Sequence, residues 1–159
     1  MTFGRILAAV VVAASALLIA PTSNADAPEA QQEEWVLESI TRPGDVWDQT
    51  NWDWDPMFPV IAHPYHGEDN QKWYIGDDGT IRDKMYGWCV TEIDGRLAGR
   101  DCDGSESQRW VGQPYDDYHS WLFESGSSGR CVTHNGEYAE LILTWCDPAR
   151  TDQHWNIHH

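Results

Sequence analysis

The tripeptide Gln-x-Trp occurs three times in this chain at a nearly constant period. One copy would carry little information, but three copies in a common surrounding layout indicate an internal repeat. Repeated units of this length bury their apolar faces against one another, so the pattern predicts one fold built from three equivalent units. The copies are Gln71-Lys72-Trp73, Gln108-Arg109-Trp110 and Gln153-His154-Trp155.

The second and third copies share a cysteine frame. In each, one cysteine lies six or seven residues before the Gln, and a Gly-x-Cys-Val segment lies further upstream. The first copy has Tyr65 where the others have this nearer cysteine. Along the chain, short apolar runs alternate with turn-forming dipeptides such as Asp94-Gly95 and Asn135-Gly136, without a long amphipathic helix pattern. This alternation predicts an all-β sandwich or barrel.

Residues 1–25 are predicted to be a secretory signal peptide. An apolar run over residues 6–20 follows an arginine and precedes a stretch of small residues, the order typical of exported proteins. The run is short for a membrane span. We place cleavage after Ala25; cleavage after Ala27 and an uncleaved membrane anchor are the alternatives. Residues 26–34 are predicted to form a flexible acidic leader.

Cysteine usage favours a secreted, extracellular protein, and the charge disfavours two classes of partner. All four cysteines follow the predicted signal, and an even count in a small exported chain indicates disulfides. The cysteines form no Cys-x-x-Cys pair of the kind found in zinc ribbons. The formal net charge of −16 repels phosphate backbones and anionic lipid heads. We therefore expect neither nucleic-acid binding nor membrane insertion.

The repeated motifs resemble the ricin-type β-trefoil lectin family, in particular its small secreted bacterial members. The family pattern is Gly-x-Cys-apolar-Asp, a loop, an apolar strand into a second Cys, and then Gln-x-Trp. The resemblance covers residues 35–159 and implies a β-trefoil, with three four-stranded repeats, a six-stranded barrel and a cap of hairpins. The repeats would span about 35–75, 76–112 and 113–159. Closing the barrel removes the exposed strand edges that each unit would have alone.

The resemblance also implies roles for the repeated residues. The Gln side chain braces the turn before the last strand of each repeat, and the Trp enters the core. The cysteines pair within a repeat, as Cys89–Cys102 and Cys131–Cys146. The equivalent interior positions of the barrel are expected at Val60, Leu97 and Leu141.

The first repeat departs from the pattern because it contains no cysteine. Gly44–Asp48 stands where Gly-x-Cys-apolar-Asp is expected. We align Val46 with the first cysteine, so that Trp47 corresponds to the valine after it. A register slipped by one residue is also open, and it would turn Gln49 instead of Asp48 toward a ligand.

Family resemblance implies a shallow sugar pocket in the first repeat. An Asp after the first Cys position accepts hydrogen bonds from sugar hydroxyls, an aromatic residue stacks on the ring, and an Asn before the Gln adds a hydrogen bond. Asp48, His63 and Asn70 hold these positions. Asn51, Trp52 and Trp54 in the long loop are further candidates, although the two tryptophans could instead cover the barrel mouth. We expect Asp48 to lie at the surface and to support no core contact.

The corresponding positions are changed in the other two repeats, which we expect to serve as scaffold. A weak site in the third repeat, formed by Asn135, Tyr138 and Trp145, is the alternative. The Asp is replaced by Thr91 and Thr133, the aromatic residue by Arg100 and Thr144, and the Asn by Ser107 and Asp152.

No cofactor or metal site is predicted. His63 and His66 flank Pro64, which favours an extended strand over a helical pair of zinc ligands. The acidic loop from Asp48 to Asp55 lacks the Gly and the Glu of a calcium-binding EF-hand. Neither a nucleophile elbow nor a phosphate-binding loop is present, so we do not expect an enzyme.

These observations together predict a secreted, non-catalytic carbohydrate-binding protein. Its partners would be galactose-, mannose- or glucose-type glycans, bound mainly by the first repeat. The alternative is a trefoil that has lost sugar binding and acts as a protein-interaction or toxin-associated module, with a protein partner.

Overall fold

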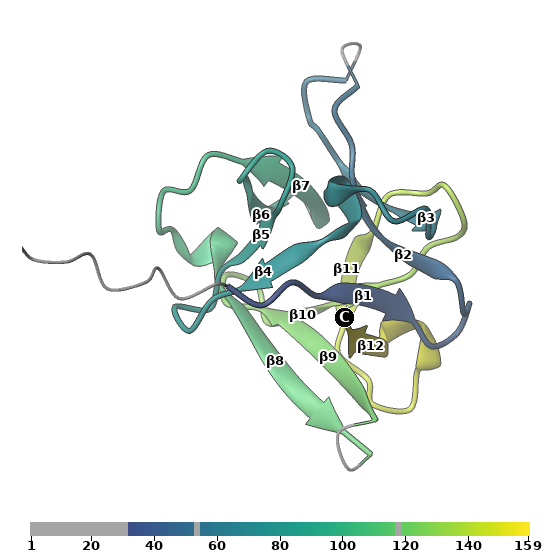
Figure 1. The fold of residues 1–159 in the computed structure, drawn as a ribbon. Helices are drawn as coiled ribbons and strands as arrows, with labels where there is room; N and C mark the ends of the chain where they lie inside the picture. Colours follow the sequence, from purple (N-terminus) through teal and green to yellow (C-terminus); the bar gives the residue numbers. More distant parts are fainter. Residues whose placement is uncertain (1–31, 53–54, 117–118) are drawn as a thin grey trace, which may run out of the picture. The chain divides into compact units, whose positions relative to one another are not determined.

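The three Gln-x-Trp segments occupy the same place in three successive four-stranded units. In each unit a short 3-10 helix ends at the Gln, and the last strand begins at the Trp (Figure 1). The computed structural model describes residues 32–52, 55–116 and 119–159. The predicted signal peptide and residues 26–31 of the predicted leader lie outside the described residues.

The described chain contains twelve strands and three 3-10 helices. The first unit comprises β1 (Val36–Ser39), β2 (Asp45–Gln49), β3 (Val60–Pro64), η1 (Asp69–Gln71) and β4 (Trp73–Ile75). The second comprises β5 (Ile81–Asp83), β6 (Cys89–Ile93), β7 (Arg96–Arg100), η2 (Glu106–Gln108) and β8 (Trp110–Tyr115). The third comprises β9 (Ser120–Ser125), β10 (Arg130–Thr133), β11 (Ile142–Trp145), η3 (Thr151–Gln153) and β12 (Trp155–His158). The predicted repeat boundary at residue 112 falls inside β8.

The first and last strands of the three units form a closed barrel. Antiparallel pairing joins β1 to β12, β12 to β9, β9 to β8, and β4 to β5. Two backbone contacts complete the ring: Trp35 pairs with Trp73 before β1 begins, and Trp110 N–H donates to the Gly79 carbonyl over 2.8 Å. The prediction of an all-β trefoil is confirmed. No helix in the three described segments is long and apolar enough to cross a membrane.

The remaining six strands form three hairpins that meet over one end of the barrel. The N–H of Leu141 donates to the Val60 carbonyl over 2.9 Å, and that of Leu97 donates to the Leu141 carbonyl over 3.3 Å. All three side chains are fully buried. The three positions are equivalent and buried, as predicted, but they lie in the hairpin cap and not in the strands of the barrel. Their mutual hydrogen bonds bring the β2–β3, β6–β7 and β10–β11 hairpins together.

A hydrogen bond that recurs in all three repeats fixes the register of β2. Nε1 of Trp73 donates to the Trp47 carbonyl over 3.2 Å, as Nε1 of Trp110 does to Val90 and Nε1 of Trp155 does to Val132. Trp47 is thus the counterpart of the two valines, which excludes the register slipped by one residue. The Trp47 ring lies in the core and meets the Trp73 and Trp155 rings edge-on.

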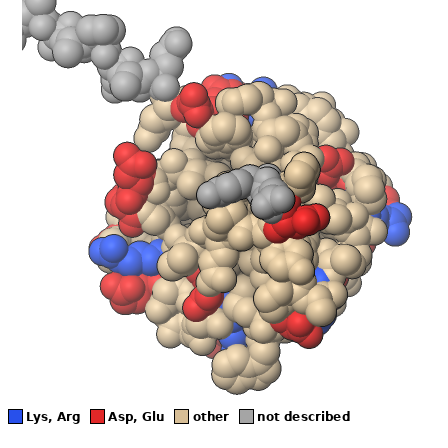
Figure 2. Space-filling model, turned by 90° about the horizontal axis from the view of Figure 1, so that it is seen from below, with Lys and Arg blue, Asp and Glu red and all other residues tan. Residues whose placement is uncertain are grey.

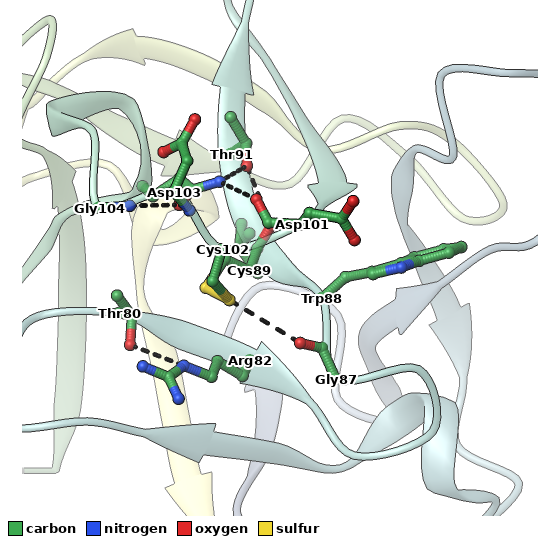
Figure 3. Close-up of a disulfide and its surroundings, with 12 residues drawn as sticks. Thr80, Arg82, Gly87, Trp88, Cys89, Thr91, Asp101, Cys102, Asp103 and Gly104 are labelled. Carbon is green, nitrogen blue, oxygen red and sulfur yellow. Dashed lines mark hydrogen bonds between the residues drawn. A yellow bond between two sulfur atoms is a disulfide. The ribbon is translucent and has the colours of Figure 1, made fainter.

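Two disulfides close the hairpins of the second and third repeats, with the predicted pairing Cys89–Cys102 and Cys131–Cys146. Figure 3 shows the first of them against β6, with Thr91 two residues further along the strand. Each cross-link closes a short loop and stabilises the fold by about 3 kcal/mol in the chain-entropy model. In the first repeat Val46 and Tyr65 stand in place of the two cysteines. Val46 is buried, while Tyr65 is half exposed.

Acidic residues dominate the charge of the chain. Figure 2 shows Asp and Glu at several separate places of the face drawn, with fewer Lys and Arg among them. Dispersed charge of one sign favours solubility and disfavours polyanionic partners.

Candidate functional site

Asp48 is the centre of a buried hydrogen-bond network in the first repeat. Its side chain projects from β2, all of whose residues are buried. Oδ2 accepts hydrogen bonds from Nε2 of Gln71 over 2.9 Å and from Nε2 of His66 over 3.1 Å. Oδ1 accepts one from Nδ2 of Asn70 over 2.9 Å. Three donors from η1 and the segment before it therefore hold this carboxylate in one orientation.

The expectation that Asp48 lies at the surface without supporting contacts is wrong. Asp48 is only 5% exposed. The cause is the trefoil repeat itself, because the Gln of every Gln-x-Trp donates to the β2-equivalent strand at this position. Nε2 of Gln108 donates to Oγ1 of Thr91, and Nε2 of Gln153 to Oγ1 of Thr133. The first repeat alone has a carboxylate here.

Burial raises the pKa of the Asp48 carboxyl above its ordinary value of 3.8. The hydrogen bond from Gln71 and the neighbouring histidines His63 and His66 act in the opposite direction, but the loss of solvation dominates. The carboxylate is thus an acceptor in a poorly solvated place, where a directional hydrogen bond to a ligand is strong.

A cavity of about 410 Å³ opens above this carboxylate. His63 at the end of β3 lines it, and so do Asn51 and Trp52 from the long loop after β2. Trp54, the remaining predicted loop residue, lies outside the described residues. Asn70 lines the cavity too, but its amide donates to Asp48 and to the Gln49 carbonyl. Asn70 therefore positions the carboxylate.

The third repeat contributes Tyr138 to this cavity. The Tyr138 backbone has a φ of 59°, a left-handed conformation that strains a non-glycine residue. A hydrogen bond of 2.7 Å from its N–H to the Ala62 carbonyl holds it beside β3. Its ring meets the His63 ring edge-on, with centroids 4.9 Å apart. Tyr138, considered above for a third-repeat site, thus lies at the first-repeat cavity.

The second repeat contributes Tyr86, which no sequence pattern had indicated. Tyr86 lies in the β5–β6 connection, where its ring stacks on Trp88 with centroids 4.7 Å apart. Asp83 shapes this connection by accepting hydrogen bonds from the N–H groups of Tyr86 and Trp88. Aromatic rings from two neighbouring repeats therefore border a polar cavity of the first.

The equivalent positions of the second and third repeats are engaged in internal contacts. The Arg100 guanidinium donates to the carbonyls of Met57 and Gly99. Oγ1 of Thr144 accepts from Gln153 and Arg150. Trp145 in the third repeat is 74% exposed, and the Arg130 guanidinium lies 5.5 Å from its ring centroid.

A larger cavity of about 630 Å³ lies at the open end of the barrel. It is mostly apolar and is bordered by residues of the barrel strands, among them Trp110, Trp121 and Ile157. Ligand sites combine apolar walls with a few convergent polar groups. The smaller cavity is more polar, and it gathers the convergent hydrogen-bonding groups around Asp48 beside aromatic rings, so we take it as the candidate site.

The same cavity brings together three side chains that can bind metals. One carboxylate oxygen of Asp48 and one ring nitrogen each of His63 and His66 lie within 4.8 Å of one another. Pro64 keeps the chain extended, as expected, but the turn after β3 returns His66 to Asp48. Helical spacing is therefore a poor guide to a histidine pair here, because a turn and not a helix brings His66 back to Asp48.

The family model described as the ricin-type β-trefoil lectin domain matches residues 37–155. The chain belongs to the ricin-type β-trefoil lectin family. Among curated proteins, no sequence matches it. Several solved structures share its trefoil fold at low sequence identity.

A ricin B-like lectin from Macrolepiota procera, solved with lactose, has a TM-score of 0.65 and 19% identity over 82% of this chain and 98% of its own. The designed threefold-symmetric protein ThreeFoil has a TM-score of 0.67 and 20% identity over 78% of this chain and 96% of its own. A mosquitocidal holotoxin has a TM-score of 0.69 and 17% identity over 80% of this chain. This chain spans only 17% of the holotoxin's length.

Proposed function

We propose that this trefoil is a secreted, non-catalytic protein that binds one glycan in the cavity above Asp48. The observation that carries the proposal is the buried Asp48 carboxylate, which is held by three donors at the floor of a cavity bordered by aromatic rings. Carboxylate oxygens accept hydrogen bonds from neighbouring sugar hydroxyls. Aromatic faces pack against the C–H groups of a sugar ring. Galactose-, mannose- or glucose-type ends of glycans meet both requirements.

Secretion is part of the proposal. The two disulfides are stable in an oxidising compartment, and residues 1–25 have the order of a signal peptide. The acidic surface suits a neutral polyol better than a polyanion.

A glycan array probed with the secreted chain tests this proposal. We expect binding to a defined set of neutral glycan ends. Asp48→Asn keeps the volume of the side chain but places an NH2 group among three donors, so we expect at least a tenfold loss. Thr91→Ser and Thr133→Ser, at the equivalent positions, are the matched controls and should bind as the parent does.

Two other results would redirect the proposal. Glu68 also lines the cavity, and a pair of carboxylates is the machinery of glycoside hydrolases, so the bound glycan should be recovered intact. Hydrolysis would contradict the non-catalytic assignment. A silent array together with a co-purifying protein would favour the alternative of a protein-interaction or toxin-associated module.

A further inference from the structure

Two histidines and one carboxylate meet at the floor of the Asp48 cavity. Oδ2 of Asp48 lies 3.1 Å from Nε2 of His66. Two ligands that each bind zinc at about 2.0–2.1 Å in a tetrahedral site lie about 3.3 Å from each other. The two atoms are therefore already close to the separation that a shared zinc ion requires. The ion would replace the proton that now joins them, and the bound ring would keep its one proton on Nδ1. A charged ring would therefore release the Nε2 proton to solvent, whereas a neutral ring would exchange it for a proton on Nδ1.

His63 has the tautomer that a metal ligand needs. Its Nδ1 lies 2.8 Å from the Pro64 carbonyl. Because a carbonyl only accepts hydrogen bonds, Nδ1 carries the proton and the lone pair lies on Nε2. Metal-binding histidines commonly donate their other ring N–H to a carbonyl or a carboxylate, which fixes the ring and the tautomer.

Two side-chain amides also hold the Asp48 carboxylate in place. Gln71 and Asn70 donate to its two oxygens over 2.9 Å each. These contacts keep Asp48 in place whether a proton or a metal ion lies between it and His66. His66 is exposed, so a small rotation can bring its ring to the ion at little cost in packing.

We propose that Asp48, His63 and His66 bind one divalent transition-metal ion, with Zn²⁺ preferred over Ca²⁺ and Mg²⁺. Two imidazoles and one carboxylate suit zinc, whereas calcium and magnesium favour oxygen ligands alone. Three protein ligands leave a fourth position of a tetrahedral ion open to the cavity. Water or Glu68, which also lines the cavity, can fill it.

Metal and glycan then compete for the same carboxylate. Gln71 donates to Oδ2 of Asp48 and Asn70 donates to Oδ1, so each oxygen keeps one lone pair for a further partner. A zinc ion would take the Oδ2 lone pair, and the ion with its fourth ligand would fill the part of the cavity where sugar hydroxyls would otherwise reach the carboxylate. Zinc would therefore weaken glycan binding. This competition rests on the proposed function, whereas the metal site itself does not.

Calorimetric titration of the secreted chain with ZnCl2 tests the site directly. We expect one ion per chain, and at least tenfold weaker binding in His63→Gln and in His66→Gln. Thermal unfolding of each variant should match that of the parent, because neither ring lies in the core and a glutamine amide can still donate to Asp48. The terminal pair His158 and His159 could also hold zinc, so the double variant His158→Gln/His159→Gln is the matched control and should bind like the parent.

Four outcomes would overturn the metal assignment: no heat with zinc, unchanged binding in the two cavity variants, loss of binding in the terminal variant, or stronger binding of CaCl2 than of ZnCl2. Repeating the glycan array with zinc and with EDTA then tests the competition. We expect a weaker signal in zinc. An equal signal in a chain that binds zinc would overturn the competition alone, and glycan binding without any zinc binding would overturn the metal site while leaving the proposed function intact.

Discussion

Nε2 of Gln71 donates a hydrogen bond to Oδ2 of Asp48 over 2.9 Å, so the structural glutamine of the first repeat directly contacts the candidate ligand-binding carboxylate. In the second repeat the same amide nitrogen of Gln108 donates to a threonine hydroxyl. Both glutamines also accept backbone N–H bonds that brace the preceding turn, at His66 and at Asp103. Gln71 therefore both braces the fold and contacts the candidate site, whereas Gln108 only braces the fold.

Substituting the two glutamines should separate stability from binding. Gln71→Ala and Gln108→Ala each leave partly buried backbone N–H donors unpaired and open a cavity at a buried side chain, so we expect each to lower the free energy of unfolding by about 1–3 kcal/mol. Only Gln71→Ala also releases the Asp48 carboxylate, and it alone should weaken glycan binding. Urea unfolding together with glycan titration below the unfolding transition checks this. Equal glycan affinity in both variants would contradict the link between Gln71 and the site.

The core tryptophans provide a second matched pair. Nε1 of Trp47 is buried and has no hydrogen-bond partner among the described residues, whereas Nε1 of Trp73 donates to the Trp47 carbonyl. Phe in either place removes similar volume, but only Trp73→Phe breaks a hydrogen bond. We expect Trp73→Phe to destabilise the protein by about 1 kcal/mol more than Trp47→Phe, as measured by urea unfolding. A larger loss in Trp47→Phe would show that ring packing outweighs the hydrogen bond.

The pH dependence of stability should report on Asp83. Burial raises the pKa of its carboxyl above the ordinary 3.8, against the backbone N–H groups of Tyr86 and Trp88 that lower it. The folded protein therefore binds this proton more tightly than the unfolded chain does. The resulting stabilisation is complete below pH 3.8 and is lost as pH rises through the folded-state pKa.

Asp83→Asn cannot titrate, so its stability relative to the parent isolates this contribution. We expect the parent's advantage over Asp83→Asn, measured by urea unfolding, to be larger at a pH of about 3 than at about 7. The other acidic groups are common to both proteins and cancel in the difference. An advantage that grows with rising pH would mean that the backbone donors outweigh burial.

The fold was readable from the sequence because it rests on local, repeated chemistry. Each Gln-x-Trp places a buried amide and a buried indole at the same point of its unit, and the cysteine frames set the strand pairing. This repetition predicted three equivalent units, and the resemblance to the ricin-type family that it carries implied the trefoil, both disulfides and the place of Trp47.

Only part of the candidate site could be predicted from the sequence, because residues of all three repeats line it. The family pattern identified Asp48, but not its burial, which follows from the three-dimensional position of Gln71 and His66. Tyr138 reaches the cavity through a left-handed turn and a hydrogen bond to the Ala62 carbonyl. Such a contact joins residues that are far apart along the chain, so no local sequence pattern predicts it.

The proposed function requires that the first repeat alone binds a glycan. Isothermal titration of the secreted chain with a glycan selected on the array tests it most directly, since three intact sites would give three ligands per chain. We predict one glycan per chain, with no measurable heat for Asp48→Asn and parental affinity for Thr133→Ser. Two or three glycans per chain, or parental affinity in Asp48→Asn, would contradict the account.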